Sequence, residues 1–136
     1  MAHRLHTDGG ARGNPGPSAA GIVLEDSSGT EVKRFGQFLG HATNNEAEYR
    51  ALILGLEMAL GEGVEELECF LDSELVVSQL IGAYKVKNPR MKVFWDNVKR
   101  LESQFSGVTY NHVTRDKNAD ADKLVNEVLD AKAQEL

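Results

Sequence analysis

The chain has 136 residues, is 41% hydrophobic and 26% charged, and carries a formal net charge of −6. These values are ordinary for a globular domain, no apolar run approaches the roughly 20 residues of a membrane span, and no signal peptide opens the chain. The acidic balance argues against a protein that coats nucleic acid without selectivity. We therefore expect one domain over residues 1–136, monomeric and without a membrane partner. A reducing cytoplasm is the expected compartment, because the single cysteine, Cys69, excludes an internal disulfide.

Three strand-like runs open the chain, and their short connections predict an antiparallel meander. A helical pattern then begins at Thr43–Glu46, which has the residues of a capping box. Strong helix formers follow, and Gly61 ends the pattern. The expected strands span residues 3–8, Ala19–Glu25 and Thr30–Leu39, and the expected helix spans Ala47–Leu60.

The second half of the chain alternates again between strand and helix patterns. The order βββαβααβα predicts an α/β fold with a five-stranded sheet. A right-handed crossover through the long helix is possible from the first strand (Leu5) or from the third strand (Leu39) to the fourth (Leu71). If the first and fourth strands are parallel neighbours, Asp8 and Asp72 lie side by side at their C-terminal ends, where open α/β sheets bind their ligands. The expected elements are a strand at Leu67–Leu71, helices from Ser73 to about Ala83 and from Met91 to about Phe105, a strand at Val108–Thr114, and a helix from Asn118 to about Gln134.

The segment from Thr7 to Ser18 is the most informative stretch of the sequence. Asp8 ends the first strand pattern, and four glycines and two prolines follow it. Such a composition predicts an irregular loop rather than a helix or a paired strand. It places an acid at a strand end beside backbone that a large ligand can approach closely. A simple turn with Asp8 as a turn former is the alternative.

Three further acids occupy comparable places. Asp72 follows the fourth strand directly, Glu48 lies on the apolar face of the long helix, and Asp122 lies in the first turn of the last helix. Each also has a plain structural interpretation. Asp72 could cap the helix that starts at Ser73, Asp122 could favour a helix N-terminus, and Glu48 could be partly exposed. Glu46, by contrast, is explained by the capping box alone, so we assign it no catalysis.

Four converging carboxylates without a cysteine or histidine pair favour a hard cation with oxygen ligands. Mg²⁺ fits such a site, with Mn²⁺ as a possible substitute, whereas zinc does not. Two such ions about 3.5–4 Å apart drive in-line displacement at a phosphodiester. Several acids are needed because two dications in one pocket repel each other. The carboxylates therefore predict a two-metal nuclease site.

The chain resembles the type 1 ribonuclease H (ribonuclease HI) family in motifs that occur in the family's order and spacing. The resemblance covers nearly the whole chain, and it implies a ribonuclease H-like α/β fold. That fold is a five-stranded mixed sheet, three antiparallel strands and then two parallel ones, flanked by helices. The metal ligands and catalytic acids that it implies are Asp8, Glu48, Asp72 and Asp122. The matching pieces are Thr7–Gly10, Gly13–Pro17, Thr43–Glu48, Asp72–Ser73 and Asn118–Leu124.

The resemblance also implies the substrate and the residues that bind it. The family cleaves the RNA strand of RNA/DNA hybrids and leaves a 5′-phosphate, and RNA is distinguished by its 2′-hydroxyl in a wide, shallow minor groove. Thr43 and Asn14 occupy the positions that grip a phosphate of the DNA strand. These asparagines and glycines also serve as turn and cap residues. The positions that read the 2′-hydroxyl fall on Gly9, Gly10, Asn14, Asn44 and Asn45.

Two departures point to a compact, archaeal-type branch of the family. The basic helical protrusion of many bacterial members shrinks to Tyr84–Lys92, whose four basic residues either contact a nucleic-acid backbone or form a solvated loop. The family's catalytic-loop histidine is missing, and the shortened loop carries Arg115, a candidate phosphate contact or product-release residue. His112 falls within the last strand pattern and is assigned to packing.

The leading hypothesis is therefore a divalent-metal endonuclease acting on RNA/DNA hybrids. A second hypothesis keeps the same metal site but adds cleavage of RNA/RNA duplexes, since a shortened loop could relax strand selection. A third, from another class, is a hybrid-binding module without catalysis. Four intact acids argue against that third hypothesis, because clustered carboxylates repel phosphate unless a metal neutralises them.

Overall fold

A computed structural model describes residues 1–135 and places five strands in one mixed sheet within that range. The strand order is β3-β2-β1-β4-β5; β1, β2 and β3 pair antiparallel, whereas β4 pairs parallel with both β1 and β5. The predicted mixed sheet is thus confirmed, and of the two crossovers that the sequence allows, the one that makes the first and fourth strands parallel neighbours is present. The strands are β1 (His3–Ala11), β2 (Gly16–Glu25), β3 (Glu31–Ala42), β4 (Glu66–Leu71) and β5 (Gly107–His112).

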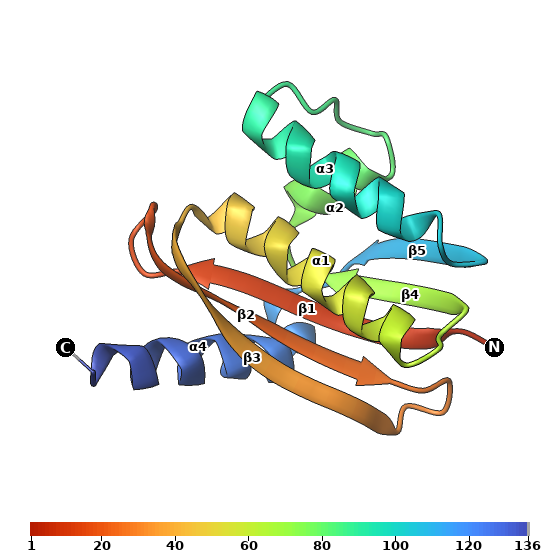
Figure 1. Cartoon of the computed structure of the whole chain (residues 1–136), viewed down its shortest axis with the longest axis horizontal. Helices are drawn as coiled ribbons and strands as arrows, with labels where there is room; N and C mark the ends of the chain where they lie inside the picture. The colour runs from red at the N-terminus through yellow and green to blue at the C-terminus, as the bar shows by residue number, and fades with distance from the viewer. Residues whose placement is uncertain (136) are drawn as a thin grey trace.

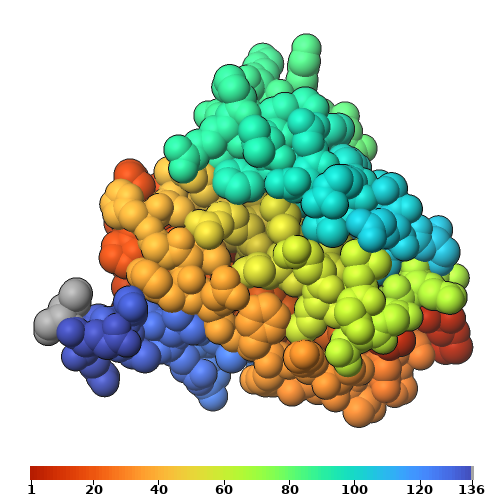
Figure 2. Space-filling view, viewed as in Figure 1, coloured from red at the N-terminus to blue at the C-terminus, as the bar shows by residue number. Residues whose placement is uncertain are grey.

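Helices cover both faces of the sheet (Figure 1). Helix α1 lies across β1 and β2 on one face, α3 packs on α1, and α4 lies on the opposite face against β2 and β3. In the same orientation, Figure 2 shows part of α1 in view between α3 and β3. No helix among residues 1–135 has the length and apolarity needed to cross a bilayer. The helices are α1 (Asn44–Gly61), α2 (Glu74–Leu80), α3 (Pro89–Glu102), the 3₁₀ turn η1 (Arg115–Asn118) and α4 (Ala119–Ala133).

Helix α2 is shorter than the sequence pattern predicts. Ser73 caps α2 by accepting a hydrogen bond from the Val76 N–H at 3.3 Å, but α2 ends at Leu80 rather than near Ala83. Gly82 adopts a φ of 84°, a left-handed conformation that stops a helix. Residues 81–88 contain no helix, so the expected reduction of the basic protrusion is confirmed.

The main core lies between the sheet and α1. Apolar side chains of β1, β2, β4 and β5 meet those of α1, α2 and α3 there, and Cys69 is fully buried among them, as predicted. A smaller cluster on the opposite face joins the sheet to α4 through Ala19, Val125 and Leu129. Both faces of the sheet are therefore covered by packed helices.

The glycine-rich segment differs from its prediction. Strand β1 continues through Gly9 and Gly10 to Ala11, and these residues pair with Ser18–Ala20 of β2, so the expectation of an unpaired loop is wrong. Gly9 is needed for the close packing of α1 on β1, whereas Gly13, with a φ of 90°, lies in the turn that follows β1. A Cβ at Gly9 would overlap the carbonyl of Ala47 in α1, and a Cβ at Gly10 would meet Val125 of α4 at 3.4 Å.

Gly9→Ala is therefore expected to lower the free energy of unfolding by about 3 kcal/mol, at the upper end of ordinary overpacking costs. The clash is with helix backbone, which cannot move aside as a flexible side chain would. Gly61→Ala is the matched control, because nothing lies within 4 Å of its Cβ position. That control should be neutral or slightly stabilising. Chemical denaturation of both variants is the measurement, and equal stabilities would contradict the close approach of α1 to β1.

Candidate active site

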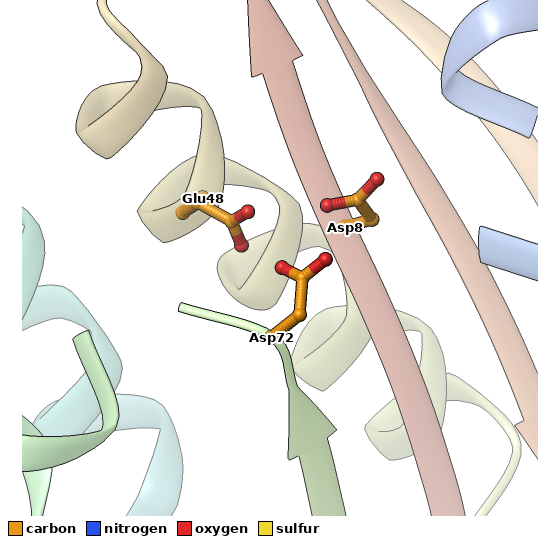
Figure 3. Close-up of side chains that lie close together, drawn as sticks. All are labelled: Asp8, Glu48 and Asp72. Atoms are coloured by element: carbon orange, nitrogen blue, oxygen red, sulfur yellow. The ribbon is translucent and has the colours of Figure 1, made fainter. Parts of the chain in front are cut away.

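Three carboxylates meet where the central strands approach the start of α1 (Figure 3). Asp8 lies in β1, Asp72 directly follows β4, and Glu48 lies near the start of α1. One oxygen from each lies within 4.8 Å of the oxygens of the other two. The parallel register of β1 with β4, which pairs His6 with Phe70, explains why the two aspartates stand side by side.

Asp122 is placed at the same cleft but stands apart from these three. It lies in the first turn of α4 and is half-buried, and an open cleft of about 580 Å³ contains it together with Asp8, Glu48 and Asp72. Two contacts bring α4 close to the strands. Asn118 Nδ2 donates to the Thr7 carbonyl at 2.8 Å, and Gly21 leaves room for the Ala121 carbonyl.

The three clustered acids carry charge that the protein does not compensate. Burial raises the pKa of Asp8 to about 7, and the charge of Asp72 adds to the rise. Burial also raises the pKa of Glu48 well above its usual range, with further contributions from Asp8 and Asp72. Buried like charges are costly unless an opposite charge is supplied. The site therefore favours a bound cation near neutral pH.

The donor set fits a hard divalent ion. All of the clustered ligand atoms are carboxylate oxygens, and the Oε2 atom of Glu48 is buried without a hydrogen-bond partner within the described chain. A buried acceptor without a donor costs free energy, which a coordinated cation removes. Oxygen ligands suit Mg²⁺ or Mn²⁺ and fit zinc poorly.

The residues expected to bind substrate fall into two groups. Most of them line the cleft beside the acids; these are Gly9, Gly10, Asn44, Asn45 and Arg115. The other two, Asn14 and Thr43, support this wall from outside the cleft lining.

Asn14 and Thr43 hold the start of α1 in place. Asn14 Oδ1 accepts the Asn44 N–H at 3.0 Å, and Asn44 Oδ1 accepts the Ala11 N–H at 2.9 Å, so the end of β1 is tied to α1. Thr43 caps α1 with Glu46, and the predicted capping box is confirmed. The Thr43 Oγ1 atom accepts the Glu46 N–H at 3.2 Å.

Three cleft residues were missed by sequence reasoning. His112 is exposed at the end of β5 beside the acids, so its assignment to packing is wrong. Its pairing with Leu71, the residue before Asp72, explains this location and could have been found by aligning the last two strands in parallel. Arg12 and Asn126 also line the cleft, and no spacing rule indicated either of them.

Comparison with known proteins agrees with this architecture. A family model described as "Reverse transcriptase-like" matches residues 6–128. Ribonuclease HI from Halobacterium salinarum is 43% identical over 129 residues, which are 93% of this chain and 65% of that protein. The chain belongs to the type 1 ribonuclease H family. The "Bifunctional protein Rv2228c" from Mycobacterium tuberculosis is 43% identical over 96% of this chain, which spans only 36% of that relative.

Solved ribonuclease H structures superpose closely on the chain. The RNase H1 of the halophilic archaeon Halobacterium salinarum has a TM-score of 0.94 at 40% identity, covering 96% of this chain and 99% of that one. LC11-RNase H1, isolated from compost, was solved in complex with an RNA/DNA hybrid; it has a TM-score of 0.92 at 40% identity, covering 96% and 99% of the two chains. The ribonuclease H fold therefore extends over nearly all of this chain.

The reduced protrusion of this ribonuclease H carries basic residues that already have partners. Arg90 donates to Glu46 Oε2 from Nε at 2.9 Å and from Nη2 at 2.8 Å, which joins α3 to the capped end of α1. Lys92 contacts Asp96 at 2.6 Å and lies over the Trp95 ring at 4.2 Å. Arg90 therefore has a structural role in addition to any contact with nucleic acid.

Proposed function

We propose that this chain is an endonuclease that hydrolyses the RNA strand of RNA/DNA hybrids and leaves a 5′-phosphate. The observation that carries the proposal is the group of three acids within 4.8 Å, placed at the cleft of a ribonuclease H fold. A relative of 40% identity was solved with an RNA/DNA hybrid, which supports the same substrate class here. The whole protein's activity is part of this proposal, because the chain spans about a third of its mycobacterial relatives.

We propose that Asp8, Glu48, Asp72 and Asp122 hold two Mg²⁺ ions when substrate is present, with Mn²⁺ as a substitute. Such ions lower the pKa of an attacking water and stabilise the charge that develops on the leaving oxygen. The four side chains supply negative charge, and Asp8 and Glu48 are largely buried at the floor of the cleft. Because the pKa of Asp8 is raised to about 7, metal binding at Asp8 competes with protons below about pH 7, and the raised pKa of Glu48 acts in the same direction.

Hybrid recognition is assigned to the wall of the cleft formed by β1 and α1. Gly9 and Gly10 line the cleft beyond His6, the last residue of β1 that pairs with β4, so the edge of their backbone is assigned to the sugar 2′-hydroxyl that distinguishes RNA from DNA. Asn44 and Asn45 belong to the same reading surface, and the bond from the Ala11 N–H fixes the Asn44 amide. Asn14 and Thr43 are assigned to a DNA phosphate.

One cleavage assay separates this function from its alternatives. Labelled RNA/DNA, RNA/RNA and DNA/DNA duplexes are incubated with Mg²⁺, Mn²⁺ or EDTA, and the products are resolved on a gel. Metal-dependent cutting of RNA in the hybrid is expected, with 5′-phosphate ends. Cutting of RNA/RNA would support the broader duplex ribonuclease, whereas binding of the hybrid without cutting would support the non-catalytic module.

We also propose that the chain is a monomer in the cytoplasm and that residues 1–136 form one domain. Cys69 is buried and forms no disulfide, which suits a reducing compartment. The helices on both faces pack on one sheet, which supports a single folding unit. Light scattering of the purified chain checks the monomeric state.

The affinity for hybrids is expected to depend weakly on salt. Each neutralised phosphate contributes a slope of roughly −0.9 in log K against log salt for B-DNA. The chain is acidic, and Arg90 is engaged by Glu46, so few phosphates are neutralised. Replacing Lys85, Lys87 and Lys92 by alanine should make the slope shallower still. A wild-type slope equivalent to eight or more phosphates would show that the protein presents a much larger basic surface.

Arg115 is expected to aid turnover through its charge alone. It lies in the cleft at the start of η1, and a guanidinium remains protonated at every accessible pH. Arg115→Ala should lower kcat modestly without changing the shape of its pH profile, and Arg115→Lys should recover part of the loss. An unchanged kcat in the alanine variant, or loss of an ionisation from its profile, would contradict this role. His112→Ala is measured in parallel, and a specific loss of kcat there would move the role to His112.

A further inference from the structure

Asp122 differs from the other three acids in how it is held. Asp8 and Glu48 are buried, and both belong with Asp72 to the tight group, whereas Asp122 is half-buried on α4 outside that group. Asn126, one helical turn later, donates a hydrogen bond to the Asp122 carboxylate. Asn126 Nδ2 lies 3.4 Å from Asp122 Oδ2 and 3.2 Å from the Asp122 carbonyl.

The orientation of Asn126 is set by Arg12. Arg12 Nη2 donates to Asn126 Oδ1 at 3.4 Å and to Asp130 Oδ1 at 2.6 Å. Because a guanidinium has donors only, the Asn126 oxygen faces Arg12 and its amide nitrogen faces Asp122. A chain of contacts therefore runs from Asp130 through Arg12 and Asn126 to Asp122, and it joins the end of β1 to α4.

This chain of contacts contributes little to the stability of the fold. Arg12 and Asp130 have side chains that are 45% and 64% exposed, and pairs of that kind contribute less than about 1 kcal/mol. Asn126 is exposed as well. Yet Arg12 and Asn126 both line the cleft that holds the four acids. Their location suits the positioning of a cleft carboxylate better than the stabilisation of the domain.

We propose that Asn126 is a positioning residue that holds the Asp122 carboxylate for binding of divalent ions, and that Arg12 acts through Asn126. The inference rests on the proposed metal-dependent function and extends it to residues outside the acids. Residues that orient a metal ligand typically change metal affinity or activity 10- to 100-fold when they are replaced. Asp8 and Glu48 are buried, so packing already restricts their side chains.

Two substitutions at Asn126 test the proposal against a purely steric role. Asn126→Ala removes the donor, and Asn126→Asp keeps the size but turns a second acceptor toward Asp122. Mn²⁺ binding to the substrate-free protein is measured by titration calorimetry, and the Mg²⁺ concentration for half-maximal cleavage is measured separately. Asn126→Ala should weaken both about 10-fold while KM for the hybrid and the melting temperature stay unchanged. Asn126→Asp should raise the half-maximal Mg²⁺ concentration further, because repulsion displaces the Asp122 carboxylate.

The role of Arg12 is tested by combining its substitution with that of Asn126 in a double-mutant cycle. Arg12→Ala should weaken Mn²⁺ binding less than Asn126→Ala does, and the double variant should be no weaker than Asn126→Ala alone, because both changes act on one contact. Lys132→Ala is the matched control: it removes a cation of α4, the helix that carries Asn126, together with its exposed ion pair with Glu135. That control should leave metal binding and cleavage unchanged.

Three outcomes would overturn the proposal: unchanged Mn²⁺ binding in Asn126→Ala, equal behaviour of the alanine and aspartate variants, or additive effects of the Arg12 and Asn126 changes. An increase in hybrid KM alone would make these residues substrate contacts instead. Failure of the proposed function is seen separately, as a wild-type protein that binds Mn²⁺ but cuts no hybrid. The Mn²⁺ titrations still decide the positioning role in that case.

Discussion

Replacing Asp72 by asparagine should reduce kcat on an RNA/DNA hybrid by about 10³-fold or more. Divalent ions contribute several kcal/mol to stabilising the transition state of such a displacement, and each factor of ten in rate corresponds to about 1.4 kcal/mol. Asp72 shares the group of three acids with Asp8 and Glu48, so the substitution removes one of the proposed metal ligands. Asp8→Asn should have the same effect. Binding of the hybrid should persist in both variants, because less negative charge then faces the phosphates.

Glu46→Gln is the control for these two variants. Glu46 is as buried as Glu48 and lies two residues before it, but it bonds to Thr43 and Arg90 rather than facing the cleft. The change weakens the contact with Arg90 and should lower the free energy of unfolding by about 1 kcal/mol while leaving cleavage intact. Gel assays of purified, folded variants give the comparison. Substantial Mg²⁺-dependent cleavage by Asp72→Asn would remove Asp72 from the set of metal ligands.

The metal-free protein should lose stability as the pH rises from about 4 to about 7. The pKa of Asp8 is raised in the folded state to about 7 from an ordinary value of 3.8. The folded state therefore retains a proton that the unfolded chain releases, so this contribution to stability is complete below pH 3.8 and is lost as the pH passes through about 7. The loss is on the order of a few kcal/mol. Glu48, whose pKa is also raised, acts in the same direction.

Thermal unfolding at several pH values, with and without Mg²⁺, measures this effect. Asp8→Asn should be more stable than wild type in EDTA at pH 8 and similar to it at pH 4, because asparagine has no proton to release. Adding Mg²⁺ at pH 8 should raise the melting temperature of wild type much more than that of the variant, since the ion binds only the folded state. Asp26→Asn is the control, because Asp26 is a surface carboxylate that accepts hydrogen bonds from the Ser28 and Thr30 N–H groups. This variant should not show the gain in stability at pH 8 that is expected of Asp8→Asn. Equal melting temperatures of wild type and Asp8→Asn at pH 8 would contradict the buried, uncompensated charge.

The positions of the acids along the chain could be predicted because local signals define them. Asp8 and Asp72 stand at the ends of apolar strand patterns, and the capping box at Thr43 sets the start of α1 and thereby the helical turn that carries Glu48. Strand, cap and helix patterns depend on neighbours a few residues away, which the sequence displays directly. Which earlier strand pairs in parallel with the fourth was left open by the sequence, because both the first and the third strand permit a right-handed crossover.

Contacts between distant segments were decided only by the tertiary structure. The glycines after Asp8 were interpreted as a loop, whereas Gly9 stays in a paired strand because α1 crosses it at backbone distance. His112 reaches the cleft through the parallel register of β5 with β4, and Arg12 reaches Asn126 across 114 positions of the sequence. Such contacts depend on how whole elements pack, and no local periodicity encodes them. The sequence by itself therefore determined the family, the order of the elements and the four acids, whereas the packing of α1 and α4 against the sheet decided which side chains surround those acids.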